Sequence, residues 1–517
     1  MDLLVVGLDG LSYNMLDRFE VDTPYLDSVR ESGVSGDLMS VDTPTTVPAW
    51  TSFATGTDPG THGITNMLRQ ESDYSTGPAR PNRTQPAIYD FLDSGVFVNL
   101  PASVGRVPAG DDSHLVSAFL AKDKADAVPA ELKSLDSYDD YVLDHDRSLK
   151  MRPNAYLDHV LEITTQRHRF AREAFETYDP RVGFVLFSTP DWGGHILSNL
   201  SSDTKRREFY STLVELVDEK TADLAELADN VALMSDHGFE HKDTNLHVGE
   251  WLHDEGYFVE ADTGTDWTDV AVGGAKAVAK RSDALYGVIR KVHNLIMGTS
   301  VGSQLESAAS PQIDYPNSEA WQLRYGCLYV NDDRFDHPSV EDPDALRREI
   351  RDGLRQVTDD EGNEIFRDVL LPEEVYNDPG PQAPDVICRP AQHCFPITLW
   401  SPTGGVTSGT DNYEHRYRGI VAVDGPAFAD GEDDIAEEIA GMSIVDMLPT
   451  LLTALGESIS PDFDGEVRTD LLADGTPDPA VMSRDEIPPA LTREDDVGDD
   501  DREDEVEQRL ADLGYME

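Results

Sequence analysis

Short apolar runs alternate with longer amphipathic segments along most of the chain. Three apolar runs have the length of β-strands: Leu3–Leu8, Val182–Phe187 and Val231–Ser235. Three segments between or beside them have the length and spacing of helices: Thr23–Ser32, His159–Tyr178 and Glu208–Ala228. Because such alternation is typical of strands connected by helices, it predicts an α/β fold with a largely parallel central sheet between helical layers.

The pattern is interrupted once, near the middle of the chain. Residues 262–314 contain a stretch of small residues followed by a helical pattern at Leu285–Met297, and strand and helix signals resume after them. We therefore expect a core formed by residues 1–261 and 315–480, with residues 262–314 as an inserted, lid-like subdomain. Residues 485–517 are dominated by Asp and Glu up to Gln508 and are expected to form an acidic tail.

The charge of the chain is extreme. Its 517 residues include 41 Lys and Arg against 100 Asp and Glu, which gives a net charge of −59, while 39% of the residues are hydrophobic. That apolar content is too high for a disordered acidic protein. Nucleic acids and anionic membranes would be repelled, so we expect neither as a partner. Carboxylates spread along the whole chain favour a halophilic protein, the alternative being an ordinary acidic cytosolic enzyme.

Three features favour a cytoplasmic location. The first ten residues have no basic region ahead of their apolar run, so they are typical of a strand and not of a signal peptide. No stretch approaches the roughly 20 apolar residues of a membrane span. The three cysteines, Cys327, Cys388 and Cys394, are few, odd in number and without the close pairing of a metal site.

Acids and histidines follow the three strand-like runs. They are Asp9 after the first run, Asp191 and His195 after the second, and Asp236 and His237 after the third. Each pair alone is explained equally well by a turn or a helix cap. Together they place carboxylates and imidazoles at one edge of a parallel sheet, which is where ligands bind in such folds. A mixed Asp/His set suits Zn²⁺, with Mn²⁺ or Fe²⁺ as alternatives.

A hydroxyl-rich segment supplies a candidate nucleophile. Thr45 and Thr46 stand before Val47-Pro48, at the start of a segment of helical character. A hydroxyl in that position could meet an anion at a helix N-terminus, and a nearby metal could lower its pKa. The alternative is that these threonines are simply N-caps.

Taken together, the motifs resemble those of the alkaline phosphatase superfamily, and most closely its type I phosphodiesterase/nucleotide pyrophosphatase branch. The resemblance runs from residue 1 to about Leu455. It is carried by Asp9-Gly10, Thr46-Val47-Pro48, Thr55-Gly56, Pro59, His62-Gly63-Ile64, Asp191-x-x-x-His195, Ser235-Asp236-His237-Gly238, Trp321–Asn331, Ala383–Ile387, His415 and Asp446-x-x-Pro449-Thr450.

The resemblance implies a two-metal site, typically of zinc. One ion would be held by Asp191, His195 and His415, and the other by Asp9, Asp236 and His237 with Thr46 as a further ligand. Thr46 is preferred to Thr45 as the nucleophile because it directly precedes Val47-Pro48. His415 is matched by its order in the chain, and His393 is the competing candidate.

The implied activity is that of a metal-dependent phosphoric ester hydrolase, a phosphodiesterase or pyrophosphatase that forms a phosphothreonine intermediate on a small-molecule substrate. Alternatives within the superfamily are a monoester phosphatase, a phosphomutase or a sulfatase, although Thr46–Trp50 lacks the Cys or Ser and the Arg of a sulfatase motif. A noncatalytic metal-binding protein is the alternative from another class.

Two further observations concern the substrate. Ala49 stands where nucleotide-cleaving members commonly carry an Asn that holds a phosphoryl oxygen, so nucleotide specificity does not follow from the resemblance. Trp50, Trp192 and Tyr413 could stack on a base or sugar, or could simply pack in the interior.

The acidic composition predicts a dependence on salt. Repulsion among surplus carboxylates is screened by ions, so the melting temperature should fall when salt is lowered from molar to tens of millimolar. Thermal unfolding followed across this range by circular dichroism measures the effect. An unchanged melting temperature would contradict the halophilic interpretation and would leave the predicted chemistry unaffected.

Overall fold

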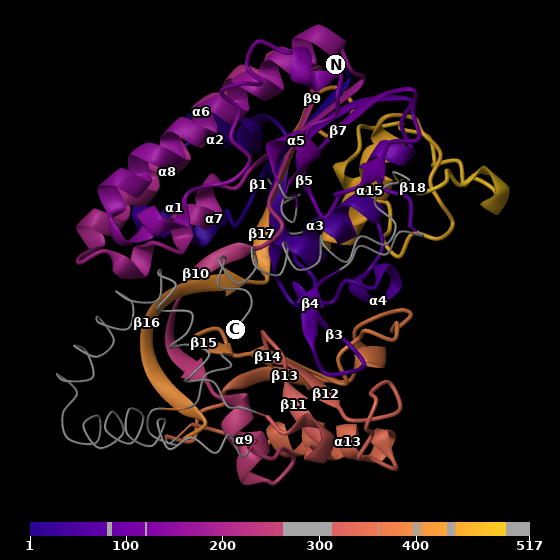
Figure 1. The fold of residues 1–517 in the computed structure, drawn as a ribbon. Coiled ribbons are helices and arrows are strands. Elements are labelled where there is room, and N and C mark those ends of the chain that lie inside the picture. Colours follow the sequence, from indigo (N-terminus) through magenta and orange to yellow (C-terminus); the bar gives the residue numbers. More distant parts are fainter. Residues whose placement is uncertain are drawn as a thin grey trace. The chain divides into compact units, whose positions relative to one another are not determined.

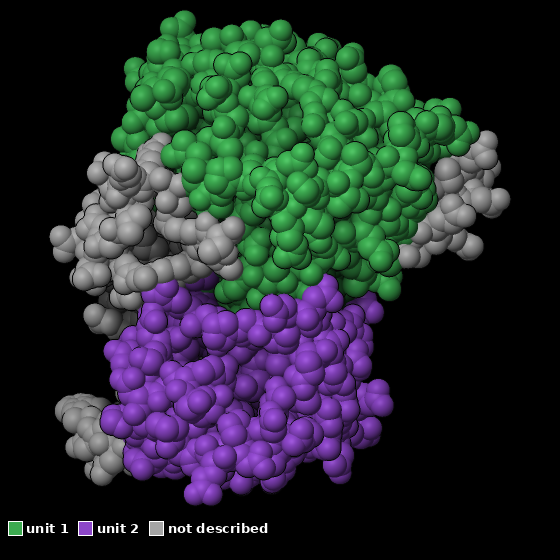
Figure 2. Space-filling model, turned by 90° about the vertical axis from the view of Figure 1, so that its right-hand side faces the viewer, with its two compact units in different colours: residues 1–67, 80–240, 415–506 green, residues 68–79, 241–414, 507–517 purple. Residues whose placement is uncertain are grey.

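A computed structural model describes residues 1–79, 85–118, 121, 123–261, 313–359, 361–396, 401, 405–431, 439 and 441–492. Its chain divides into two compact units, which Figure 2 shows in different colours. Unit 1 comprises Met1–Met67, Arg80–Glu240 and His415–Val506. Unit 2 comprises Leu68–Ala79, His241–Glu414 and Glu507–Glu517. The predicted core, residues 1–261 and 315–480, therefore contributes to both units.

Unit 1 is built on a seven-stranded sheet (Figure 1). In spatial order its strands are β2 (Val34–Met39), β17 (Arg418–Asp424), β9 (Asn230–Met234), β1 (Leu3–Leu8), β8 (Val182–Phe187), β5 (Ser94–Pro101) and β7 (Asp112–Ala118). β17 runs antiparallel to both of its neighbours, and the other pairings are parallel. All residues of β1 and β8 are buried, which explains why these strands are uninterrupted apolar runs.

Helices cover both faces of this sheet (Figure 1). One layer contains α1 (Tyr13–Phe19), α2 (Pro24–Ser32), α6 (Pro153–Tyr178), α7 (Thr189–Gly194) and α8 (Asp203–Ala225). The other contains α3 (Thr46–Thr55) and α15 (Met447–Ala454). Short helices α4 (Pro59–His62) and α5 (Lys124–Ala127) and the strand pair β6 (Arg106–Val107) and β18 (Leu491–Thr492) complete the unit. The predicted three-layer α/β architecture with a mostly parallel sheet is confirmed.

The apolar core of unit 1 includes large aromatic side chains between the sheet and α3. Trp50 packs edge-on against Phe53 and Phe184 with ring centroids 5.7 and 5.8 Å away. Trp50 is completely buried, and Tyr413 of unit 2 is also buried. Both residues are therefore packing residues and do not offer a free face to a substrate.

Unit 2 has a smaller, antiparallel sheet with the strand order β11 (Ala320–Gln322), β12 (Cys327–Val330), β14 (Val386–Pro390) and β13 (Phe366–Leu370). Its core also includes residues of α9 (Val248–Asp254) and α13 (Pro343–Leu354). The hairpin β3 (Leu68–Gln70) and β4 (Thr76–Pro78) belongs to this unit. A three-stranded sheet contains β15 (Cys394–Pro396), β10 (Gly238–Leu246) and β16 (Thr407–Arg416), in that order. The chain passes from one unit to the other within β10 and again within β16.

Two predicted segments fall largely outside the described residues. Of the subdomain predicted at 262–314, only Ile313 and Asp314 are described, and of the tail predicted at 485–517, only the part up to Thr492. Among the described helices, none combines the length and the apolar character that a membrane crossing requires. All three cysteines are buried and form no disulfide.

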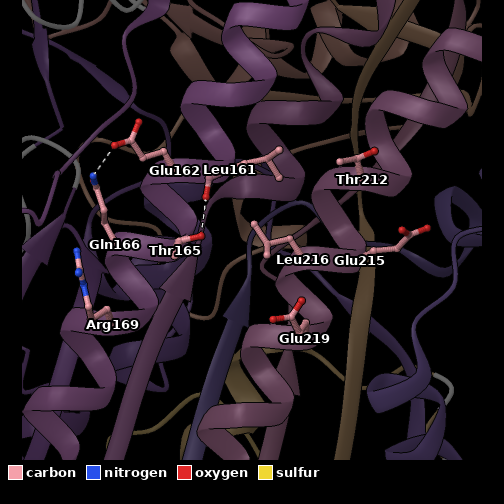
Figure 3. A pocket seen from close by; sticks show the side chains of 9 residues that line it. All are labelled: Leu161, Glu162, Thr165, Gln166, Arg169, Thr212, Glu215, Leu216 and Glu219. Atoms are coloured by element: carbon pink, nitrogen blue, oxygen red, sulfur yellow. Dashed lines mark hydrogen bonds between the residues drawn. The ribbon is translucent and has the colours of Figure 1, made fainter.

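Helices α6 and α8 carry several glutamates on their outer faces. Between their outer faces lies an open hollow of about 770 Å³ (Figure 3). Its lining includes Glu162, Glu215 and Glu219, with Arg169 as the cation among the lining residues. The opposite face of α6 is buried against the sheet, so this long helix separates a charged, solvated side from an interior side.

Candidate active site

The three predicted aspartates lie at the carboxyl ends of neighbouring strands in unit 1. The register of the sheet pairs Gly7 of β1 with Leu186 of β8 and with Met234 of β9. Asp9 follows β1 directly, and its amide donates to the carbonyl of Phe187 at 3.1 Å. Because all three strands end at the same level, the acids that follow them meet at one edge of the sheet.

Asp9, Asp236 and His237 form the first group of candidate ligands. One ligand atom from each lies within 4.8 Å of those of the other two, and all three residues are buried. The Nε2 atom of His237 is 3.3 Å from Oδ2 of Asp236 and 3.8 Å from Oδ1 of Asp9. Two carboxylates and an imidazole in this arrangement can hold a divalent cation.

Asp191, His195 and His415 form the second group, again with ligand atoms within 4.8 Å of one another. Asp191 lies in α7 and His195 follows that helix, so one helical turn brings them together, with Oδ1 of Asp191 3.4 Å from Nε2 of His195. His415 comes from β16, and its Nε2 lies 3.3 Å from the same Asp191 oxygen. The competing candidate His393 belongs to neither group.

The two groups adjoin each other through their histidines. The rings of His237 and His415 are stacked, with centroids 3.8 Å apart. The ring of Phe239 lies edge-on to those of His195 and His415, at 4.9 and 5.0 Å. All six candidate ligands therefore occupy one continuous cluster within unit 1.

Backbone carbonyls orient two of the imidazoles. Nδ1 of His415 is 2.9 Å from the carbonyl oxygen of Pro44, and Nδ1 of His237 is 3.2 Å from that of Gly238. A carbonyl can only accept, so in each ring Nδ1 carries the proton. When the ring is neutral, Nε2 keeps its lone pair directed into the cluster, which is the tautomer that a metal requires.

Several polar atoms of the cluster have no hydrogen-bond partner among the residues that the structure describes. They are Oδ1 of Asp9, Oδ1 of Asp191, Oδ2 of Asp236 and Nε2 of His237, all of them buried. Leaving a buried polar atom unpaired costs about 1–3 kcal/mol, so four in one place call for a ligand. A divalent cation in each group fits the donor set, and the structure therefore contains two groups of residues able to hold such an ion.

The three carboxylates are electrostatically unequal. Burial raises the pKa of Asp9 well above its usual value, and the neighbouring Asp236 and Asp191 raise it further. Burial also raises the pKa of Asp236, to about 7. Burial would do the same to Asp191, but His195 and His415 hold its pKa well below the ordinary value. Burial, aided by His415, keeps the pKa of His237 low, so this ring is neutral and free to bind a metal.

The candidate nucleophile lies at the start of α3. Thr46 is the first residue of this helix and is half-buried, whereas Thr45 is the N-cap and is 0% exposed. The hydrogen bond from His415 to Pro44 fixes the chain two residues before Thr46 at the second ligand group. Of the two threonines, Thr46 is therefore the one whose side chain a substrate could reach.

The backbone conformation at position 10 explains why a glycine follows Asp9. Its φ of +71° is costly for other residues, and an added Cβ would lie 3.1 Å from the Cα of Asp191. Its amide donates to Oδ1 of Asp236 at 3.2 Å. The Asp9-Gly10 turn therefore brings the chain close to both other aspartates.

Three residues near the cluster were not identified as functional from the sequence. Ser235 donates to the carbonyl of Leu11 at 2.8 Å and accepts from the amide of Ile420 at 2.7 Å, tying the ends of β1 and β17 to β9. Phe239 packs against the histidines, and Arg167 lies buried on α6. Ser235 had a signal in the sequence as the first residue of the Ser235-Asp236-His237-Gly238 motif, and Arg167 had one as a charged residue on the apolar stripe of a helix.

Comparison with known proteins decides the family. The model of the family described as type I phosphodiesterase / nucleotide pyrophosphatase matches residues 3–418. The chain belongs to this family of phosphoester hydrolases. The resemblance to the alkaline phosphatase superfamily inferred from the motifs is thereby confirmed. A comparison with curated protein sequences finds no match.

Two solved structures are similar to this chain at low sequence identity. Phosphonoacetate hydrolase from Sinorhizobium meliloti 1021, solved with phosphonoacetate, is 14% identical, with 88% of this chain and 95% of that chain covered and a TM-score of 0.52. Human ectonucleotide pyrophosphatase / phosphodiesterase 5 is 14% identical over 91% of this chain and 100% of that chain, with a TM-score of 0.47. The likeness to the hydrolase confirms the alkaline-phosphatase-like α/β fold.

The raised pKa of Asp236 predicts how metal-free protein responds to pH. Folding raises this pKa from an ordinary 3.8 to about 7, so the folded state binds the extra proton and is progressively destabilised as the pH rises through this interval. In protein treated with a chelator, Asp236→Asn should increase the free energy of unfolding by about 1–3 kcal/mol at pH 8 and leave it nearly unchanged at pH 4. Urea unfolding at both pH values measures this.

The exposed Asp17 in α1 provides the control, since Asp17→Asn should show no such pH-dependent gain. A gain for Asp236→Asn that is equal at pH 4 and pH 8 would contradict the electrostatic explanation.

Proposed function

We propose that this protein is a two-metal phosphodiesterase or pyrophosphatase that cleaves a small-molecule phosphoester through a phosphothreonine intermediate on Thr46. The observation that carries the proposal is the pair of adjoining three-residue ligand groups, whose unpaired oxygens and nitrogen converge beside the start of α3. Membership of the phosphodiesterase family supports the same chemistry.

In this proposal each ligand group holds one divalent ion, with Zn²⁺ favoured by the Asp/His donors and Mn²⁺ as the alternative. Asp9, Asp236 and His237 would hold one ion, and Asp191, His195 and His415 would hold the other. Such ions would supply positive charge that stabilises the phosphoryl oxygens and lowers the pKa of a nearby hydroxyl.

The residues of the chain carry out the remaining tasks. Thr46 Oγ1, after losing its proton to solvent, attacks phosphorus; an O–P bond forms as the bond to the leaving oxygen breaks. Water then hydrolyses the phosphothreonine and restores the hydroxyl. Backbone amides at the start of α3 face developing negative charge there, since Thr46 begins the helix. Ala49 offers no amide side chain to the phosphoryl group, so the proposal does not extend to nucleotides.

We also propose that the enzyme works at high salt and in the cytoplasm. The net charge of −59 supports a protein adapted to high salt. Three buried cysteines without a disulfide are in keeping with a reducing, cytoplasmic environment.

Substitution of the nucleophile tests the covalent step. Thr46→Ala should retain the fold and bound metal but lose hydrolysis by about 10³-fold or more, because no other group replaces the hydroxyl. Thr45→Ala is the matched control, since the Thr45 side chain is buried and should matter far less. Steady-state kinetics on a chromogenic phosphodiester measure both variants. The reverse ranking would move the nucleophile by one residue, and two equally small losses would exclude a covalent step on either.

The surroundings of Thr46 predict a preference for diesters. A monoester brings more negative charge and usually needs an additional cation, whereas Val47, Pro48, Ala49 and Trp50 after the nucleophile provide none. An aryl phosphodiester should therefore show a higher kcat/KM than the matching monoester on the same Zn²⁺-loaded preparation, and a chelator should abolish both activities. A clear monoester preference would favour a phosphatase or mutase. Full activity in metal-free protein would contradict the metal-dependent proposal.

A further inference from the structure

The side chain of Phe239 places an apolar ring beside the candidate metal ligands. Phe239 is the second residue of β10 and is completely buried. Its ring centroid lies 4.9 Å from that of His195 and 5.0 Å from that of His415, and the ring planes meet at 85° and 67°. The ring therefore packs edge-on against both imidazoles of the second ligand group, although it has no atom that could bind a metal.

Two glycines leave the space that this ring occupies, and each stands next to a candidate ligand. A Cβ added at Gly194, the residue before His195, would lie 2.8 Å from Cδ1 and Cε1 of Phe239. A Cβ added at Gly10, the residue after Asp9, would lie 3.0 Å from Cδ2 of the same ring. Gly194 lies in α7, where alanine would be the better helix former, so the room that the ring needs explains the glycine.

The backbone of Phe239 is held by the turn that follows β1. Ser12 Oγ donates to the carbonyl of Phe239 and accepts from its amide, both at 3.2 Å. Asn14 Nδ2 donates to the same carbonyl at 3.0 Å. Because this backbone is fixed and the ring is enclosed, a shift of the ring must displace its neighbours, which include both imidazoles.

The spacing of the ligand atoms shows why such a displacement would matter. The Nε2 atoms of His195 and His415 are 3.3 Å apart, and they lie 3.4 and 3.3 Å from Oδ1 of Asp191. Bonds of about 2.0–2.1 Å to a tetrahedral Zn²⁺ separate neighbouring ligand atoms by about 3.3–3.4 Å. The three atoms thus already form a triangle of the size that such an ion requires.

We propose that Phe239 is a positioning residue: its ring, packed between Gly10, Gly194 and the imidazoles, holds His195 and His415 at the spacing in which they bind a metal ion. This inference rests on the metal binding in the proposed function. An aromatic ring suits the task because it has a fixed shape and few torsions to immobilise. Ligands held in place before the ion arrives bind it more tightly than ligands that must first be ordered.

A purely structural role for Phe239 would give a different result. If the ring only fills the interior, its replacement lowers the stability of the fold and leaves the metal affinity of the folded protein unchanged. If the ring positions the imidazoles, the metal affinity itself falls. It should fall both when the ring is removed and when the ring is pushed toward the imidazoles.

The test changes the ring and the space beside it separately. Phe239→Leu removes the ring, Gly194→Ala crowds it with one methyl group, and a double variant combines the two changes. Phe175→Leu is the matched control, because Phe175 is buried on α6 and packs against Gly183, which pairs with Leu4 at the opposite end of the strands. Circular dichroism checks that each variant is folded.

Zn²⁺ affinity is measured by competition with a chromogenic chelator at one pH and salt concentration. Phe239→Leu and Gly194→Ala should each bind Zn²⁺ about tenfold more weakly than the unchanged protein, as expected for residues that orient metal ligands. In the double variant the methyl group occupies space that the smaller side chain vacates, so affinity should return to within about threefold of the unchanged protein. Phe175→Leu should stay within about twofold.

The visible absorption spectrum of Co²⁺-loaded protein gives a readout that does not depend on activity. Because this spectrum responds to coordination geometry, it should change in Gly194→Ala and return in the double variant. Gly194→Ala removes no interior side chain, so it tests the proposal even where Phe239→Leu fails to fold.

Three results would overturn the role of Phe239. They are Zn²⁺ affinity in either single variant equal to that of the unchanged protein, losses that simply add in the double variant, and an unaltered Co²⁺ spectrum in Gly194→Ala. Failure of the unchanged protein to bind Zn²⁺ would instead overturn the metal site in the proposed function, and this inference with it.

Discussion

The structure of unit 1 depends on the burial of three carboxylates within one small region. Asp9, Asp191 and Asp236 follow adjacent strands, and the parallel register places all three at the same edge of the sheet. Taking several like charges out of water is expensive unless protons, cations or hydrogen-bond donors compensate. The surrounding residues provide part of that compensation: imidazoles lie beside Asp191, and the amide of Gly10 donates to Asp236.

This constraint explains why distant parts of the chain converge. His415 lies 371 residues after Pro44, yet its hydrogen bond to that carbonyl fixes its ring while its other nitrogen faces Asp191. The same contact holds the approach to α3, and with it Thr46. One imidazole therefore couples the position of Thr46, the proposed nucleophile, to the second candidate ligand group, which two independent loops could do only at a larger cost in conformational entropy.

The centre of the sheet could be predicted from the sequence, because β1, β8 and β9 are apolar runs, whereas the buried parallel strand β5 was not predicted. Leu3–Leu8 and Val182–Phe187 have the bounds that their apolar runs predicted, and α6 begins six residues before the predicted start, at Pro153, where proline suits the first turn. The meeting of the aspartates at one edge of the sheet was anticipated because acids followed those strands, whereas their division into two candidate ligand groups was implied by the family resemblance. His415 needed the family resemblance, since nothing local distinguishes it from His393. The contacts of Ser235 and Arg167 could not be predicted, because both side chains bind backbone groups whose positions depend on the fold.

A surface of such strong negative charge also limits how an anionic substrate could be bound. With a divalent ion in each group, four positive charges would exceed the three carboxylates, and Arg167 would add one more. At molar salt, interactions between exposed charges are screened at separations beyond about 3 Å, whereas interactions of buried charges are screened much less. High salt would therefore suppress the repulsion of a phosphoester by the distant surface while leaving the attraction of the site largely intact. Under the proposed adaptation to high salt, the conditions that favour folding of the acidic chain would then also be those in which the metal-loaded site attracts an anion most selectively.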